Sequence, residues 1–237
     1  MAAGADAAIA ALLAAALLSG QLTIGWLNDL LDADRDTAAG RTGKPLAVGD
    51  VSRGSVLAGL VVATGLCVPL SLALGWVPGV LHLVAVASAW GYDLRLKSTP
   101  ASPLPYLVSF GLLPAVAATA AGASPSVRLM VAAGVLGSAA HFANTVPDAV
   151  ADAATGVRGL PQRLGPRRSQ VVAASGVVLA CAVLLLGGWS RLSAPAVALL
   201  TVAAVVGALS PLAPSAWSFR LTMLAAGVAV AGVVAAG

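Results

Sequence analysis

Apolar residues form long runs along most of this chain, and polar residues collect in the short segments between them. A helix that crosses a bilayer needs about 20 mostly apolar residues. The pattern predicts eight such helices, at about residues 7–28, 55–75, 77–92, 104–122, 127–147, 169–188, 193–210 and 216–236. We therefore expect an all-α fold, a polytopic membrane helix bundle of about eight transmembrane helices.

Composition agrees with a chain that is embedded in a lipid bilayer. Of its 237 residues, 59% are hydrophobic and only 9% are charged, whereas soluble domains carry about 25% charged residues. The formal charge of +4 is spread over short loops and forms no basic stripe, so nucleic acid is not an expected partner. Both cysteines lie in apolar runs, which argues against a disulfide framework or a thiolate metal motif.

Basic residues are distributed unequally between the two sets of alternating loops. If there are eight spans, one side receives only Arg128 and Arg191. The other side receives Arg35, Arg41, Lys44, Arg53, Arg95, Lys97, Arg158, Arg163, Arg167, Arg168 and Arg220. Because cytoplasmic loops carry the excess of Lys and Arg, this richer side is predicted to be cytoplasmic, with both chain ends outside. The same rule does not explain why eight of the nine aspartates lie there too, all but Asp6.

The first polar segment, "NDLLDADRDTAAGRTGKP" at residues 28–45, has a counterpart later in the chain. At a constant offset of 116 residues, seven residues of the first segment are repeated by identical ones. Asn28, Asp32, Asp36, Gly40, Gly43, Pro45 and Gly49 match Asn144, Asp148, Asp152, Gly156, Gly159, Pro161 and Gly165. We therefore predict one integral-membrane domain, residues 1–237, built from two parallel four-helix repeats at about 7–122 and 127–236.

Each copy contains Asn, Asp and Asp spaced by four residues, which keeps them on one face of a helix. Carboxylates gathered in this way repel one another, and a divalent cation relieves the repulsion. Oxygen ligands without His or Cys favour a hard cation, and Mg²⁺ typically binds one or two carboxylates together with phosphates and water. The pattern predicts two acidic clusters holding a diphosphate through Mg²⁺, with Arg41, Lys44, Arg158 and Arg163 close enough to contact the outer phosphate oxygens. Solvated charges at helix ends are the alternative, which the repeat and the spacing disfavour.

The offset also ranks the acidic residues of the first copy. Asp29 and Asp34 align with Thr145 and Val150, so no acid corresponds to them in the second copy. We therefore expect Asp32 and Asp36 to matter most, Asp29 to be an accessory ligand, and Asp34 to matter least.

These segments resemble the motifs of a known family. "NDLLDADRD" and "NTVPDAVADAATGVRGLPQRLG" resemble the two aspartate-rich motifs of the UbiA superfamily of intramembrane prenyltransferases. "GRTGKPLAVG" resembles the segment after the first motif, and "WGYDLRLKSTP" resembles the Tyr/Lys-bearing segment of that family.

The resemblance implies a helical bundle around a central cavity, with the active site facing the cytoplasm, and a Mg²⁺-dependent transferase. A prenyl group, of polyprenyl or shorter length, would leave its diphosphate as an allylic carbocation and be captured by a small, aromatic acceptor. By motif position, the catalytic metal ligands are Asp32, Asp36, Asp148 and Asp152, with Asp29 as an additional metal ligand. The diphosphate contacts implied are Asn28, Asn144, Lys44, Arg158, Tyr92 and Lys97.

Several alternatives stay open at this point. The family usually has nine helices, and Met1 lies only 27 residues before Asn28, so we expect the first family helix to be missing from this chain. The same carboxylates could belong to a cation-coupled transporter. Within the superfamily, the product could be a cyclised terpene, or the acceptor a sugar phosphate or a tetrapyrrole. His141, one turn before Asn144, is either an acid/base group or a hydrogen-bonded histidine of the bundle.

Overall fold

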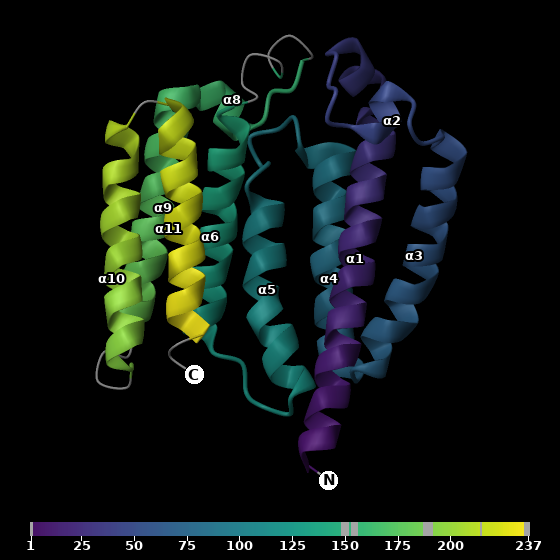
Figure 1. Ribbon diagram of the computed structural model, residues 1–237. Coiled ribbons are helices and arrows are strands. Elements are labelled where there is room, and N and C mark those ends of the chain that lie inside the picture. Colours follow the sequence, from purple (N-terminus) through teal and green to yellow (C-terminus); the bar gives the residue numbers. More distant parts are fainter. Residues whose placement is uncertain (1, 148–151, 153–155, 187–191, 214, 235–237) are drawn as a thin grey trace. The chain divides into compact units, whose positions relative to one another are not determined.

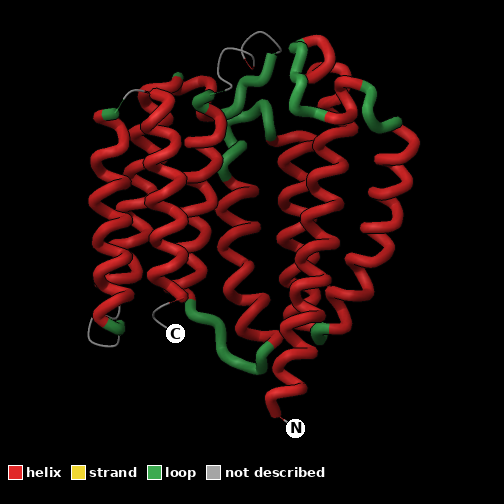
Figure 2. The backbone as a smooth tube through the Cα atoms, viewed as in Figure 1, coloured by secondary structure: helices red, strands yellow, loops and turns green. Residues whose placement is uncertain are grey.

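The structure is a computed structural model, and it describes residues 2–147, 152, 156–186, 192–213 and 215–234. Within these residues every regular element is a helix, and loops join them without any strand (Figure 2). The prediction of an all-α fold is confirmed.

The long helices of the described chain fall on the predicted spans (Figure 1). They are α1 (Ala2–Ala38), α3 (Arg53–Ala73), α4 (Trp76–Gly91), α5 (Leu104–Ala120), α6 (Val127–Thr145), α9 (Pro166–Leu186), α10 (Ala194–Leu209) and α11 (Ser215–Val234). By length and composition, four helices among the described residues, α1, α3, α9 and α10, can each cross a membrane. Helices α5 and α11 contain shorter apolar stretches.

Short elements connect the long helices where the polar motifs lie. Helices α2 (Pro45–Val48) and α8 (Leu160–Leu164) each follow one of the two aspartate motifs. A π-helix, η1 (Tyr92–Leu96), continues α4, and a 3₁₀ helix, η3 (Ser210–Leu212), continues α10. Single π-helical turns are rare and occur frequently at functional sites, which makes η1 a segment of interest.

The described chain forms two compact units. The first contains Met1–Leu96 and Leu112–Pro125, and the second contains Lys97–Gly111 and Ser126–Gly237. The segment Lys97–Gly111, which the sequence prediction assigned to the first repeat, thus packs with the second unit.

In the first unit, α1 packs against α3 and α4, and α3 packs against α4 (Figure 1). A Cβ atom on Gly79 of α4 would lie 2.6 Å from the backbone oxygen of Ser71 on α3, so these two helices touch at backbone level. Ser71 Oγ also lies 2.8 Å from His82 Nδ1 on α4, inside the unit. Close helix packing through small residues is typical of membrane proteins.

In the second unit, α9 packs against α6, α10 and α11, and small residues again allow close contact. Its core is rich in alanine and includes the fully buried side chains of Val177, Cys181 and Leu200. A Cβ atom on Gly134 of α6 would lie 2.7 Å from the backbone oxygen of Leu107. This contact is one reason why the segment Lys97–Gly111 belongs to the second unit.

Candidate functional site

The first aspartate motif lies on the last turns of α1. The apolar run ends near Asn28, but the helix continues to Ala38, so Asn28, Asp32 and Asp36 all have helical backbone. Asp32 is only 8% exposed and Asp36 only 2% exposed, whereas the Asp34 side chain is 94% exposed. Spacing by four residues has therefore placed two carboxylates on a buried face and left the intervening one in solvent.

Helix α1 ends at a glycine in the left-handed conformation. Gly40 has a φ of +64°, a conformation that costs little only for a residue without a Cβ atom. The turn lets the Arg41 amide donate a hydrogen bond to the Asp36 carbonyl at 3.0 Å. This turn leads the chain directly from the carboxylates to the following basic residues.

The second motif makes the same turn. Gly156 has a φ of +78°, and the Val157 amide donates to the Asp152 carbonyl at 3.0 Å. These residues lie 116 positions after Gly40, Arg41 and Asp36. The offset seen in the sequence thus recurs in the backbone geometry of the two turns.

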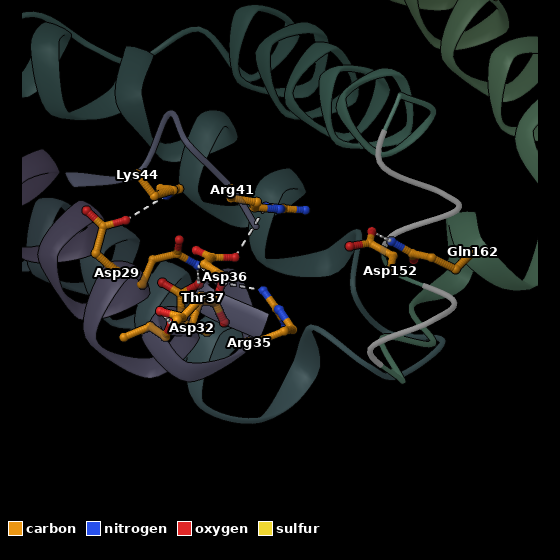
Figure 3. A network of polar contacts seen from close by, with 12 residues as sticks. Asp29, Asp32, Arg35, Asp36, Thr37, Arg41, Lys44, Asp152 and Gln162 are labelled. Atoms are coloured by element: carbon orange, nitrogen blue, oxygen red, sulfur yellow. Dashed lines mark hydrogen bonds and ion pairs between the residues drawn. The ribbon is translucent and has the colours of Figure 1, made fainter. Parts of the chain in front are cut away.

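Each buried carboxylate of the first motif has a guanidinium partner (Figure 3). Arg35 Nη2 lies 2.6 Å from Asp32 Oδ2, and Arg41 Nη1 lies 3.5 Å from Asp36 Oδ1. The second pair is within ion-pair distance but makes no hydrogen bond, and Asp36 Oδ1 is a buried oxygen without a hydrogen-bond partner. The sequence analysis expected a divalent cation to relieve the repulsion between these carboxylates. In the structure, each of them also has an arginine within ion-pair distance.

A lysine and an arginine from later segments pair with the other two aspartates. Lys44 Nζ donates to Asp29 Oδ1 at 2.6 Å (Figure 3). Arg53 pairs with the exposed Asp34. Asp29 thus forms an ion pair with Lys44, a predicted diphosphate contact. Asp34 instead pairs with Arg53, which lies at the start of α3 and outside the motif.

Asn28 connects the motif to the π-helix η1. Its Nδ2 donates to Asp32 Oδ2 at 3.1 Å and to Asp93 Oδ1 at 2.8 Å. The predicted diphosphate contact Tyr92 is the first residue of η1 and Lys97 follows the last, and both side chains are half-buried. The structure therefore brings Asn28, Asp29, Asp32, Asp36, Arg41 and Lys44 together in the first unit, with Asp93 beside them.

The second motif is described in part. Asn144 is exposed near the end of α6, and Asp148 lies outside the described residues. Asp152 is 8% exposed, and its Oδ2 accepts a hydrogen bond from Gln162 Nε2 at 2.7 Å (Figure 3). Arg158 is exposed. A neutral amide on α8 thus orients the Asp152 carboxylate.

A buried serine and histidine hold the turn that precedes α8. Ser102 Oγ accepts the Leu160 amide at 3.1 Å and lies 3.1 Å from His141 Nε2. The His141 ring stacks on Tyr106 with centroids 4.5 Å apart, and both Ser102 and His141 are almost fully buried. Of the two roles considered for His141, these contacts favour a hydrogen-bonded histidine of the bundle.

The first motif fits a hard divalent cation when phosphate oxygens complete its coordination. Among the described residues, no group of three or more His, Cys, Asp or Glu side chains lies close enough to hold a metal alone. Mg²⁺, however, usually takes one or two carboxylates with substrate phosphates and water. Asp32 and Asp36 provide two buried carboxylates on one face, and Asp36 Oδ1 lacks a hydrogen bond. The donor set is therefore suited to Mg²⁺ that arrives with a diphosphate.

Three polar residues at the site were not assigned to it from the sequence. Arg35 could have been found, because it lies three residues after Asp32 on the same helix, at a spacing that allows ion pairs. Asp93 directly follows the predicted diphosphate contact Tyr92, but its contact with Asn28 spans 65 positions. Gln162 has no sequence signal, since its contact depends on the turn before α8.

Comparisons with known proteins agree on one family. A family model described as the UbiA prenyltransferase family matches residues 1–216. No protein of curated function matches the chain.

Solved structures with the same fold cover nearly the whole chain. An apo UbiA homologue from Aeropyrum pernix K1 has a TM-score of 0.75 at 24% identity, covering 96% of this chain and 89% of the other. A UbiA homologue from Archaeoglobus fulgidus bound to GPP and Mg²⁺ has a TM-score of 0.68 at 16% identity, covering 95% and 88%. A structure described for digeranylgeranylglyceryl phosphate synthase in membranes has a TM-score of 0.72 at 16% identity, covering 98% and 86%.

Proposed function

Since this chain belongs to the UbiA prenyltransferase family, we propose that it transfers a prenyl group from an isoprenoid diphosphate to a small acceptor within the membrane. The observation that carries the proposal is the buried pair Asp32 and Asp36 at the end of an apolar helix. Arg35 and Arg41 pair with these two carboxylates, and Lys44 pairs with Asp29 of the same motif. Acidic groups for a metal and basic groups for phosphate oxygens are the two requirements for binding a metal diphosphate.

Asp32 and Asp36 are the proposed Mg²⁺ ligands of the first motif, with Asp29 as an accessory ligand. Asp148 and Asp152 are the corresponding proposed ligands of the second motif. When bound, Mg²⁺ would neutralise negative charge that builds on the departing diphosphate. The A. fulgidus homologue, which was solved with GPP and Mg²⁺, supports this assignment by analogy.

The basic residues of the first motif would exchange partners when substrate binds. Lys44 and Arg41 are held by Asp29 and Asp36, and a metal on the carboxylates would weaken these ion pairs. The released ammonium and guanidinium groups are then available to phosphate oxygens, which Arg binds in a bidentate manner. Once these positive groups have moved to the bound diphosphate, they can stabilise the leaving group without further reorganisation during the reaction.

The proposed chemistry balances without a redox partner. The bond between the first prenyl carbon and the diphosphate oxygen breaks, and diphosphate leaves with the electron pair. A new bond forms from the acceptor to that carbon, and an aromatic acceptor then loses the ring proton. The apolar helices would keep water away from the allylic cation. We propose an aromatic acceptor first; the neighbour described for digeranylgeranylglyceryl phosphate synthase makes a phosphate-bearing acceptor the second class to test.

The site is proposed to face the cytoplasm, because both aspartate motifs lie on the side that carries eleven of the thirteen Lys and Arg residues. This orientation can be tested with a membrane-impermeant thiol reagent. Cys67 and Cys181 are first replaced, and a single cysteine is then introduced near Arg53 or near Arg128. Labelling of the Arg128 position in intact cells, with the Arg53 position protected, is the expected result.

Activity can be tested with membranes that contain the protein. They are supplied with labelled prenyl diphosphates of several lengths, Mg²⁺, and aromatic or phosphate-bearing acceptors, and the prenylated product and free diphosphate are measured. We expect turnover that chelation of Mg²⁺ abolishes and that Asp32→Ala removes. Absence of turnover and of diphosphate binding at every tail length would overturn the proposal.

A further inference from the structure

We propose that Asp93 is a positioning residue of the diphosphate site, which acts by fixing the amide of Asn28. This inference rests on the proposed function and goes beyond it, because Asp93 was assigned neither to the metal nor to the diphosphate. Asp93 lies in the π-helix η1, and its carboxylate contacts a residue of the first aspartate motif 65 positions earlier in the chain.

Asn28 uses one nitrogen to join two carboxylates. Its Nδ2 donates to Asp93 Oδ1 at 2.8 Å and to Asp32 Oδ2 at 3.1 Å. An amide nitrogen has two hydrogens, so one can serve each carboxylate. The contact with Asp93 therefore constrains which way the amide points toward Asp32.

The orientation of Asn28 then determines the orientation of Asp32. Asp32 Oδ2 accepts from Asn28 and pairs with Arg35 Nη2 at 2.6 Å, so both contacts fall on the same oxygen. Two donors on one oxygen fix the rotation of the carboxylate and therefore the direction of Oδ1. Partners of this kind orient metal ligands in many proteins, and their removal typically lowers metal affinity by about 10–100-fold.

The carboxylate that Asn28 contacts lies in the π-helix η1, which continues α4. Here the π-helix starts at Tyr92, immediately before Asp93. The segment η1 therefore contains both Tyr92, the diphosphate contact that the family resemblance implies, and Asp93, which orients Asn28.

A direct charge role for Asp93 predicts a different pattern from a positioning role. If Asp93 acted through its negative charge on the metal or the acceptor, Asp93→Asn would be as harmful as Asp93→Ala. If it acts by accepting from Asn28, Asp93→Asn retains an acceptor oxygen and keeps most of the function, whereas Asp93→Ala does not.

The experiment uses purified full-length protein in detergent and inorganic diphosphate with Mg²⁺ as the probe, because the prenyl tail and the acceptor are unidentified. Binding is measured by calorimetric titration for the wild type, Asp93→Ala, Asp93→Asn, Asn28→Ala and the double variant Asn28→Ala with Asp93→Ala. Asp34→Ala is the control, since it removes an exposed aspartate from α1, the helix that carries Asn28. Thermal unfolding without ligand checks each variant, and Asp93→Leu replaces Asp93→Ala if the alanine variant does not purify.

We expect Asp93→Ala to weaken diphosphate binding about tenfold, and Asp93→Asn to weaken it about threefold or less. The double variant should bind no more weakly than Asn28→Ala, because both substitutions remove the same contact. Equal losses in Asp93→Ala and Asp93→Asn, or additive losses in the double variant, would overturn the positioning role. If Asp93→Ala binds Mg²⁺-diphosphate as tightly as the wild type does, the positioning role is overturned as well. If neither the wild type nor Asp34→Ala binds Mg²⁺-diphosphate, the proposed function itself is overturned.

Discussion

Replacing Asp36 with asparagine separates the stability of the site from its ability to bind a ligand. Asp36 is the most buried carboxylate of the first motif, at 2% exposure, and its Oδ1 lies 3.5 Å from Arg41 Nη1 without a hydrogen bond. Asparagine keeps the size and shape of the side chain and removes the charge. The substitution therefore tests whether this charge exists for folding or for a ligand.

The expected effect on stability is small because two large contributions oppose each other. Two unit charges 3.5 Å apart attract with about 5 kcal/mol at an effective dielectric constant of about 20. Removing the carboxylate from water costs several kcal/mol, and the neutral amide avoids that cost. Arg41 is 27% exposed in its side chain and can turn toward water. Because Arg41 stays partly in contact with water, we expect the loss in the free energy of unfolding to be smaller than the roughly 3–5 kcal/mol that removal of one partner of a fully buried ion pair costs.

The expected effect on binding is large. A lost metal-binding carboxylate removes several kcal/mol of interaction with the cation, which corresponds to about a hundredfold or greater loss of affinity. Calorimetric titration of Mg²⁺ with inorganic diphosphate measures the affinity, and thermal unfolding of the same preparations measures stability. Asp34→Asn is the control and should change neither quantity, because the Asp34 side chain is 94% exposed. An Asp36→Asn protein that unfolds readily yet binds diphosphate normally would refute the assignment of Asp36 to the ligand.

Three further substitutions test the packing and the second motif. Gly79→Ala would place a Cβ atom 2.6 Å from the Ser71 carbonyl oxygen, so we expect a loss of about 1–3 kcal/mol in stability; an unchanged unfolding temperature would contradict the close contact of α3 and α4. Gln162→Leu removes the donor at 2.7 Å from Asp152 Oδ2 and should weaken Mg²⁺-diphosphate binding about tenfold, with little change in unfolding; wild-type affinity would show that the amide is dispensable. Ser102→Ala leaves the first amide of α8 without its acceptor and should destabilise the turn before α8 by about 1–3 kcal/mol. We expect faster proteolytic cleavage of this turn, and an unchanged cleavage rate would argue against the anchoring role of Ser102.

Features that depend on residue spacing along one helix were predictable from the sequence. The Asn28, Asp32 and Asp36 face follows from a spacing of four, and the left-handed turn at Gly40 follows from a glycine retained at the helix end in both copies. The exposed position of Asp34 agrees with its low rank, because no acid matches it at the 116-residue offset. Long apolar runs were enough to locate the helices.

Features that depend on contacts between distant segments were not predictable. Asn28 meets Asp93 across 65 positions, and no repeat or periodic pattern relates the two residues. The π-helix that carries Asp93 is rare enough that single-sequence patterns do not indicate it. The pairing of Asp29 with Lys44 depends on the turn after α1, which returns the chain toward the carboxylates. The sequence therefore located the buried carboxylates Asp32 and Asp36, but not the groups that contact and neutralise them.

An experimental structure of the protein soaked with Mg²⁺ and a non-hydrolysable prenyl diphosphate tests the central claim most directly. We predict metal density on Asp32 and Asp36, with diphosphate oxygens contacted by Arg41 or Lys44 in place of their present carboxylate partners. Metal and diphosphate bound away from these residues, with the Asp29–Lys44 and Asp36–Arg41 pairs unchanged, would contradict the account.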